Sequence, residues 1–234
     1  MQIIKTKSAG FTLMELSVAI AIFLILAGMI IVNLQYGNQK NRLKDSATEL
    51  VQNIRLMQNY ASSGKVIKIC KGGNEAGQQC KGDSDCADGN GTCGLVPSGG
   101  FGIKFLQEIG CVNKYTLYYD LDGCKHYIAS SDLVEKEVTL PDSICIDKLE
   151  VTNAEQPPAS VDLVFQPPLA TAYINVRCEN CYVLPCGDCS SGTCESGGRL
   201  ASDGDELKIT VKHDKINQSK IITVNRLSGK VSIE

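Results

Sequence analysis

The 234-residue sequence contains no tryptophan, only two histidines, and few aromatic residues, which make up 6% of the chain. It also lacks a G-x-S-x-G sequence, a phosphate-binding P-loop, an H-E-x-x-H sequence and a dinucleotide-binding fingerprint. His126 and His213 are far apart in the sequence, and a lone histidine is more often a packed or surface residue than a catalytic base. These absences predict a protein that is not an enzyme.

Charge is absent from one long stretch near the N-terminus, between Leu16 and Gln39. About 20 apolar residues, each rising about 1.5 Å, cross a bilayer core of about 30 Å. Only a helix satisfies its own backbone groups in lipid without forming a closed barrel. We therefore predict a transmembrane helix over residues 11–34, with one acidic residue, Glu15, near its start.

A short basic leader with Lys5 and Lys7 precedes this stretch and ends at a Gly10-Phe11 junction. In an ordinary secretory signal the cleavage site follows the apolar region, whereas here it would precede it. The segment from Lys5 to Leu16 resembles the prepilin signal of type IV pilins and of the pseudopilins of type II secretion. The resemblance implies that residues 1–10 form a leader peptide, that a prepilin peptidase cleaves after Gly10, and that the new Phe11 amine is methylated.

Glu15 becomes the fifth residue of the mature chain in this interpretation. A carboxylate near lipid is costly and marks a functional position whose partner should be named. The candidate partner is the Phe11 amine of a neighbouring copy, although the amine of the same helix lies about one turn away and is an alternative. A third interpretation is an interfacial acid that reaches water among the lipid headgroups.

The net charge and the high cysteine count narrow the class of protein further. The net charge is −3, and removal of the leader leaves 21 basic and 26 acidic residues, a net charge of −5, which disfavours a general nucleic-acid binder. An even number of cysteines in an exported chain predicts disulfides formed in an oxidising compartment, and twelve are compatible with six bridges. The candidates are Cys70, Cys80, Cys86, Cys93, Cys111, Cys124, Cys145, Cys178, Cys181, Cys186, Cys189 and Cys194.

The helix is predicted to continue as an amphipathic helix over residues 35–65, because no proline interrupts it and apolar residues recur every three or four positions. Ser62-Ser63-Gly64 supplies its C-terminal stop. The expected apolar stripe consists of Leu43, Ala47, Leu50, Ile54, Met57 and Ala61. Residues 45–65 and the final strands after Ile221 also resemble H-type minor pseudopilins and the minor pilins of DNA uptake.

Residues 66–234 are predicted to form a β-rich head with two cysteine-rich inserts, 70–97 and 178–194. Short runs of β-branched and aromatic residues alternate with turn residues, and no second strong helix pattern occurs. The expected fold class is therefore α+β, with the long N-terminal helix packed on an antiparallel sheet. The Leu121-Asp122-Gly123 sequence predicts a turn, and turn chemistry explains the paired acids Asp120 and Asp122.

The inserts raise two metal hypotheses. Asp83, Asp85 and Asp88 suggest a calcium loop, but Ala87 and Gly94 occupy the fifth and twelfth positions and break the EF-hand pattern. We therefore expect a polar loop held by disulfides. The two C-x2-C pairs between Cys178 and Cys189 suggest zinc, but their separation is short for a zinc ribbon and export favours oxidation. We expect no cofactor.

The cysteine positions suggest two specific bridges. Cys111 and Cys124 flank one predicted strand and its turn, and therefore could bridge across a hairpin. Five cysteines lie in the segment 178–194, so full oxidation requires at least one bridge out of that segment, for which Cys145 is a candidate. The remaining connectivity does not follow from the sequence.

The resemblance implies a structural subunit of a type IV pilus-like filament, assembled through its apolar helix. The expected partners are other copies or related pilins, the prepilin peptidase, the assembly machinery of the inner membrane, and lipid before assembly. The head would lie outside the cytoplasm, first on a single-pass anchor and then in a filament at the cell surface or in the periplasm. One alternative is a DNA receptor at a pilus tip, using Lys208, Lys212, Lys215, Lys220, Arg226 and Lys230, although a solvated strand face explains these residues more simply. Another is a single-span membrane protein with a disulfide-rich ectodomain.

Overall fold

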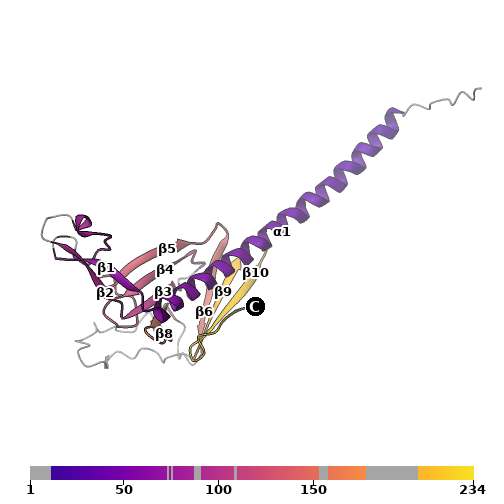
Figure 1. Cartoon of the computed structure of the whole chain (residues 1–234). Helices are drawn as coiled ribbons and strands as arrows, with labels where there is room; N and C mark the ends of the chain where they lie inside the picture. The colour runs from indigo at the N-terminus through magenta and orange to yellow at the C-terminus, as the bar shows by residue number, and fades with distance from the viewer. Residues whose placement is uncertain are drawn as a thin grey trace, which may run out of the picture. The chain divides into compact units, whose positions relative to one another are not determined.

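The structure is a computed structural model that describes residues 12–72, 74, 76–86, 91–107, 110–152, 158–177 and 205–234 (Figure 1). The long helix α1 (Leu13–Ser62) is continuous, which confirms the predicted uninterrupted helix through the apolar and amphipathic stretches. The chain divides into two compact units within this helix, between Asn41 and Arg42.

The second part of α1 forms one side of the head core. The six residues of the predicted stripe are each no more than 2% exposed and belong to one core cluster with the strands of both larger sheets. The helix ends as expected at the Ser62-Ser63-Gly64 sequence. Gly64 has a φ of +59°, and the Lys65 N–H donates to the Tyr60 carbonyl oxygen at 3.0 Å.

Two larger antiparallel sheets supply most of the rest of the head core (Figure 1). One has five strands in the order β5-β4-β3-β7-β8, and the other has four in the order β11-β10-β9-β6. The five are β3 (Gly100–Leu106), β4 (Lys114–Asp120), β5 (Leu133–Thr139), β7 (Ser160–Gln166) and β8 (Thr171–Arg177). The four are β6 (Ile144–Val151), β9 (Glu206–His213), β10 (Gln218–Asn225) and β11 (Val231–Ile233).

These strands confirm the predicted α+β class and the antiparallel arrangement. The sequence predicted the strands but not their division between two sheets. β6 follows β5 after a short turn, yet it pairs with β9, more than 50 residues later in the chain. Strand patterns do not show which distant strands pair, because each strand only requires one buried face.

A small two-stranded ribbon, β1 (Val66–Lys71) and β2 (Thr92–Pro97), lies at the two ends of the first cysteine-rich insert. The 3-10 helix η1 (Asp83–Asp85) lies between these strands in the chain. Our prediction of a polar loop over the whole insert is therefore wrong at its C-terminal end. Val96 pairs there with Ile67, which is buried in the main core.

The two larger sheets are joined along β6. The backbone of Val112, in the β3–β4 connection, forms an isolated bridge with Ile146 of β6 through hydrogen bonds of 3.2 and 2.7 Å. Farther along, the Gln107 side chain accepts a bond from the Leu149 N–H at 2.7 Å and donates to the Asp147 carbonyl oxygen at 3.3 Å. We call residues 107 and 110–113 with β6 the seam. It satisfies an edge of β6 that would otherwise be unpaired.

Candidate functional site: an exposed apolar helix

The N-terminal part of α1 has an apolar surface that nothing in its own unit covers. Leu24 is 64% exposed and Ile25 is 60% exposed. α1 is long and apolar enough to cross a membrane. An exposed apolar surface of this length marks a contact with lipid or with other protein surfaces.

Glu15 lies in the first turn of α1 and forms a reciprocal cap with Thr12. The Thr12 N–H and hydroxyl each donate to Glu15 Oε2 at 2.9 Å, and the Glu15 N–H donates to Thr12 Oγ1 at 3.2 Å. This is a capping box, which satisfies N–H groups that a helix start leaves without partners. We did not predict a role for Thr12, although its spacing to Glu15 is the sequence signature of the box.

Only one oxygen of the Glu15 carboxylate takes part in this cap. Among the residues that the structure describes, no donor reaches Oε1 of the exposed Glu15 side chain. The arrangement can therefore cap its own helix and still accept a bond from another molecule. Gly10 and Phe11, the predicted processing residues, lie outside the described residues, so their roles stay predictions.

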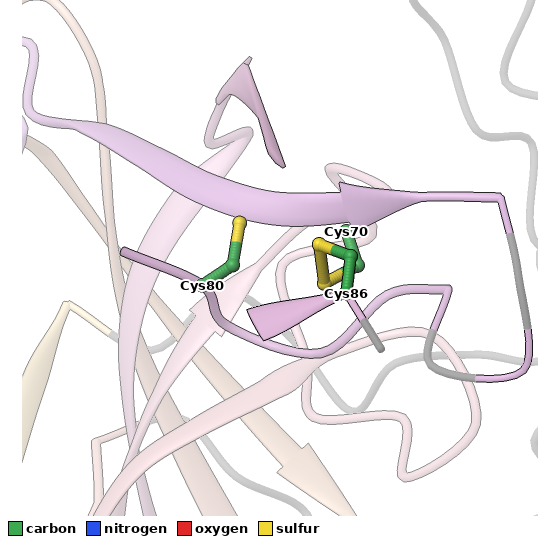
Figure 2. Close-up of side chains that lie close together, drawn as sticks. All are labelled: Cys70, Cys80 and Cys86. Carbon is green, nitrogen blue, oxygen red and sulfur yellow. A yellow bond between two sulfur atoms is a disulfide. The ribbon is translucent and has the colours of Figure 1, made fainter. Parts of the chain in front are cut away.

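Two disulfides hold the first cysteine-rich insert. Cys70 is bonded to Cys86, and Cys80 is bonded to Cys93, with Cα–Cα distances of 5.5 and 5.9 Å. Figure 2 shows Cys80 beside the Cys70–Cys86 bond. Although three of these sulfurs lie close enough to suggest a metal centre, sulfurs in disulfides are not thiolates and do not supply metal ligands of that kind.

The third disulfide corrects two of our predictions. Cys111 is bonded to Cys145, so neither the predicted Cys111–Cys124 bridge nor the predicted bridge from Cys145 to the second insert forms. Strand β4 separates Cys111 from Cys124 in sequence, but the seam brings Cys111 beside β6 instead. Cys124 is also disulfide-bonded, and its partner is not one of the other six described cysteines, because those pair with one another.

The remaining cysteine predictions concern residues outside the described part of the chain. These are Cys178, Cys181, Cys186, Cys189 and Cys194, and with them the zinc hypothesis. They stay predictions.

Two acids of the suggested calcium loop bind backbone N–H groups. Asp83 Oδ1 accepts a bond from the Cys93 N–H at 2.7 Å. Asp85 Oδ2 accepts bonds from the N–H groups of Lys81 and Gly82 at 2.7 and 3.3 Å, and these bonds hold the pKa of Asp85 below its usual value. Asp88 lies outside the described residues. The two described acids thus act as turn-forming residues of the insert.

Asp120 and Asp122 also form the turn predicted for them. Asp120 accepts bonds from the N–H groups of Gly123, Cys124 and Lys125, and Asp122 accepts bonds from Cys124 N–H and the Ser131 hydroxyl. Asp132, which we did not single out, joins them, so that carboxylate oxygens of all three residues lie within 4.8 Å. Asp132 accepts bonds from the N–H groups of Leu121 and Ile128 at 3.1 and 2.6 Å.

Burial and mutual repulsion change the acidity of this carboxylate cluster. Burial, followed by hydrogen bonding to Asp122, raises the pKa of Asp120 to about 8. Burial also raises the pKa of Asp132 to about 7. Burial opposes ionisation of Asp122 as well, but bonds from Ser131 and Cys124 hold its pKa below the usual value. The cluster therefore shares protons near neutral pH.

The two histidines are separate packed residues. His126 is 5% exposed and its Nδ1 lies 2.9 Å from the Cys124 carbonyl oxygen. His213 is 2% exposed in β9, and its Nδ1 accepts a bond from the Lys215 N–H at 3.3 Å. This matches the packed alternative that the sequence suggested for each histidine.

The basic strip proposed for DNA is partly neutralised. Lys208 Nζ lies 3.3 Å from Glu206 Oε1, and an Arg226 guanidinium nitrogen lies 3.5 Å from Asp205 Oδ1. Lys208 and Lys230 line an open groove of about 430 Å³ on the outer face of β9–β11, but Glu206 and Glu234 line it as well. This mixed charge fits a solvated strand face better than a phosphate-binding surface.

Comparison with known proteins agrees with the geometry of the N-terminal segment. Residues 5–31 match a family model described as the prokaryotic N-terminal methylation motif. The match covers the second half of the predicted leader, the Gly10-Phe11 junction, the Thr12–Glu15 cap and much of the apolar helix. Searches of curated proteins and of solved structures gave no match to the chain.

Proposed function

This chain is a pilin-like protein that carries the prepilin-type signal of the type IV pilin and pseudopilin family, and on that premise we propose that it is a structural subunit of a type IV pilus-like filament. The exposed apolar surface of α1 carries the proposal, because a helix of this length needs lipid or neighbouring helices around it. Before assembly, lipid of the inner membrane covers this surface. In the filament, the same helices of neighbouring subunits replace the lipid.

Processing of the N-terminus precedes the replacement of lipid by neighbouring helices. A prepilin peptidase cleaves after Gly10 on the cytoplasmic side, and the new amine of Phe11 is methylated. The positive amine then lies next in sequence to the Thr12–Glu15 cap. The inner-membrane assembly machinery inserts the processed subunit, whose head remains outside the cytoplasm.

Glu15 gives the filament its axial register in this proposal. Its Oε2 is bound to Thr12, whereas Oε1 remains open to a donor from outside the described chain. The Phe11 amine of a neighbouring subunit is a cation of the right size and charge. In a low-dielectric helix bundle, an unpaired carboxylate is strongly disfavoured, so a subunit in the wrong register would not be retained.

Variants at positions 15 and 12 separate the ion pair from the helix cap. Glu15→Gln removes the charge but preserves an oxygen that can complete a capping box, whereas Glu15→Ala removes both. Thr12→Ala removes the hydroxyl of the cap and leaves the acid. The measurement is the quantity of this protein in sheared, purified filaments relative to its quantity in the membrane.

We expect both Glu15 variants to reduce the filament fraction by at least about tenfold, which corresponds to the loss of about 1.4 kcal/mol per inserted subunit. Thr12→Ala should reduce it less, because the charged carboxylate remains and an exposed cap contributes only about 1 kcal/mol to the helix. Normal assembly of Glu15→Gln would show that charge pairing does not set the register. Normal assembly of Glu15→Ala would contradict the proposed role of Glu15 altogether.

A further inference from the structure

The Cys111–Cys145 disulfide lies within the seam that joins the two larger sheets. Cys145 precedes Ile146 in β6, and Cys111 precedes Val112, so the disulfide adjoins the backbone bridge between Val112 and Ile146. Without the disulfide, this end of the seam would be held by that backbone bridge. The Gln107 bonds lie farther along the strand.

One residue of this disulfide is more exposed than the cysteines of the other described disulfides. Cys111 is an exposed residue, whereas the other six described cysteines are buried or half-buried. A thiol in the surrounding solution can therefore approach Cys111 more readily than any other described cysteine. Such thiols accompany disulfide formation in oxidising compartments, where exchange with protein thiols continues.

One acidic side chain faces both sulfurs. Asp214 Oδ1 lies 3.7 Å from Cys111 Sγ and 4.0 Å from Cys145 Sγ. The carbonyl oxygen of Lys212 lies 3.8 Å from Cys145 Sγ, so its partial negative charge also faces this sulfur. Asp214 is held in place through its own N–H, which donates to the Ser143 carbonyl oxygen at 2.9 Å. The sulfurs are bonded to each other, so this group does not offer thiolates to a metal.

We propose that the negative charge of Asp214 protects the Cys111–Cys145 disulfide by slowing the exchange of this disulfide with external thiols. In the exchange step, an external thiolate attacks Cys111 Sγ and forms a new S–S bond. The Cys111–Cys145 bond breaks, and its electron pair leaves on Cys145 as a thiolate, which later takes a proton from water. No net oxidant is needed, because the external thiol is the reductant.

The carboxylate of Asp214 opposes this step twice. It repels the incoming thiolate at Cys111, and it raises the energy of the negative charge that develops on buried Cys145. The cation that lies opposite Cys145 in the sheet register is Lys212. Within the described chain, its ammonium group forms no ion pair with Asp214, so the carboxylate charge is not cancelled in that way.

The test uses the full chain in detergent and compares the wild type with Asp214→Asn. Dithiothreitol is the probe thiol, and each disulfide is followed by timed alkylation and peptide mass spectrometry. Cys70–Cys86 and Cys80–Cys93 serve as internal references in the same molecule. Asp45→Asn, which removes another exposed charge, from α1, is the matched control, and Asp214→Glu keeps the charge.

We expect the Cys111–Cys145 disulfide to be reduced about fivefold faster in Asp214→Asn than in the wild type, because an exposed charge near a reacting group has an effect of about this size. The rates of both reference disulfides should not change. Asp45→Asn should match the wild type, and Asp214→Glu should remain close to it. Added salt should accelerate the wild-type reaction more than that of Asp214→Asn. An unchanged or slower rate in Asp214→Asn would overturn the proposal. Equal acceleration of all three disulfides would also overturn it, because general loosening of the head would then be the cause.

Discussion

Glu15 caps its own helix within an apolar segment, and we propose that it also pairs with a neighbouring subunit. Its carboxylate closes the first turn of α1 through Thr12, so the acid contributes to the helix even in an isolated subunit. No donor among the described residues binds its second oxygen. An acid that served only an intersubunit pair would remain uncompensated until assembly, whereas the cap provides partners throughout.

Gly102 shows a constraint of packing at the residue scale. It lies in β3 opposite Tyr118 of β4, and a methyl group at this position would overlap ring carbons and the hydroxyl oxygen of Tyr118. Tyr118 is fully buried and its hydroxyl donates to Asp162 at 3.3 Å. The ring therefore has little freedom to move away.

Gly102→Ala should lower the free energy of unfolding by about 1–3 kcal/mol, the usual cost of overfilling a packed interior. Denaturant unfolding of the full chain in detergent measures this change. Gly82→Ala is the control, because its new methyl group would meet only Ser84 Oγ at 3.9 Å. Equal stability of the two variants would show that the Tyr118 ring is not confined as the structure indicates.

At the scale of elements, the amphipathic part of α1 was predicted most completely. Residues spaced by three and four positions are all buried, because a helix brings that spacing onto one face and the two sheets cover it. The final strands expected after Ile221 are also present, and they pair as β10 and β11. Strand β2 was missed because its Thr92-Cys93-Gly94 start resembles the loop before it.

The pairing of cysteines could not be predicted for a related reason. Cys111 is nearer in sequence to Cys124, yet its partner is Cys145, across the seam. Which strand lies beside the β3–β4 connection depends on how β6 pairs with β9, and no local pattern specifies that. Asp132 was missed similarly, because only the fold of the loop between β4 and β5 brings it to Asp120 and Asp122.

Leu50→Ala tests the contribution of the helix face. Leu50 is completely buried, and truncation in a packed core typically costs about 2–5 kcal/mol. Arg55→Ala, on the exposed face of the same helix, should change stability by less than about 0.5 kcal/mol. Thermal unfolding followed by circular dichroism measures both. A similar small effect for the two variants would contradict the packing of α1 on the sheets.

The loop between β4 and β5 should make the stability of the head depend on pH. Asp120 and Asp132 ionise near pH 4 when unfolded, but their folded pKa values are raised by burial to about 8 and about 7. Between the unfolded and the folded pKa values, the folded chain binds more protons than the unfolded chain. Its stability therefore falls as the pH rises from about 4 to about 8. The lowered pKa of Asp122 acts oppositely, but its contribution is lost only as the pH falls below about 4.

Carbon-13 NMR of the aspartate carboxyl groups measures these titrations directly. Two carboxyls should titrate between about pH 6 and 9, and the unfolding temperature should fall as the pH rises from about 4 to about 8. Assignment of both carboxyls to ordinary values near 4 would contradict the burial and repulsion described for this cluster.

At the scale of the whole molecule, two parts of the chain suit different chemical environments. The apolar part of α1 suits lipid or a helix bundle, whereas the head relies on disulfides and therefore suits an oxidising compartment. An N-terminal anchor in the inner membrane with the head outside the cytoplasm satisfies both. Within the head, the seam and the Cys111–Cys145 disulfide link the two larger sheets.

Processing at the N-terminus tests the central claim most directly. The measurement is the mass of the N-terminal peptide of this protein, recovered from the filament and membrane fractions of its own cells. The account predicts a chain that begins with methylated Phe11 in both fractions, because cleavage precedes assembly. A chain that still begins with Met1 and is confined to the membrane would contradict it, and would instead identify a single-span membrane protein with a disulfide-rich ectodomain.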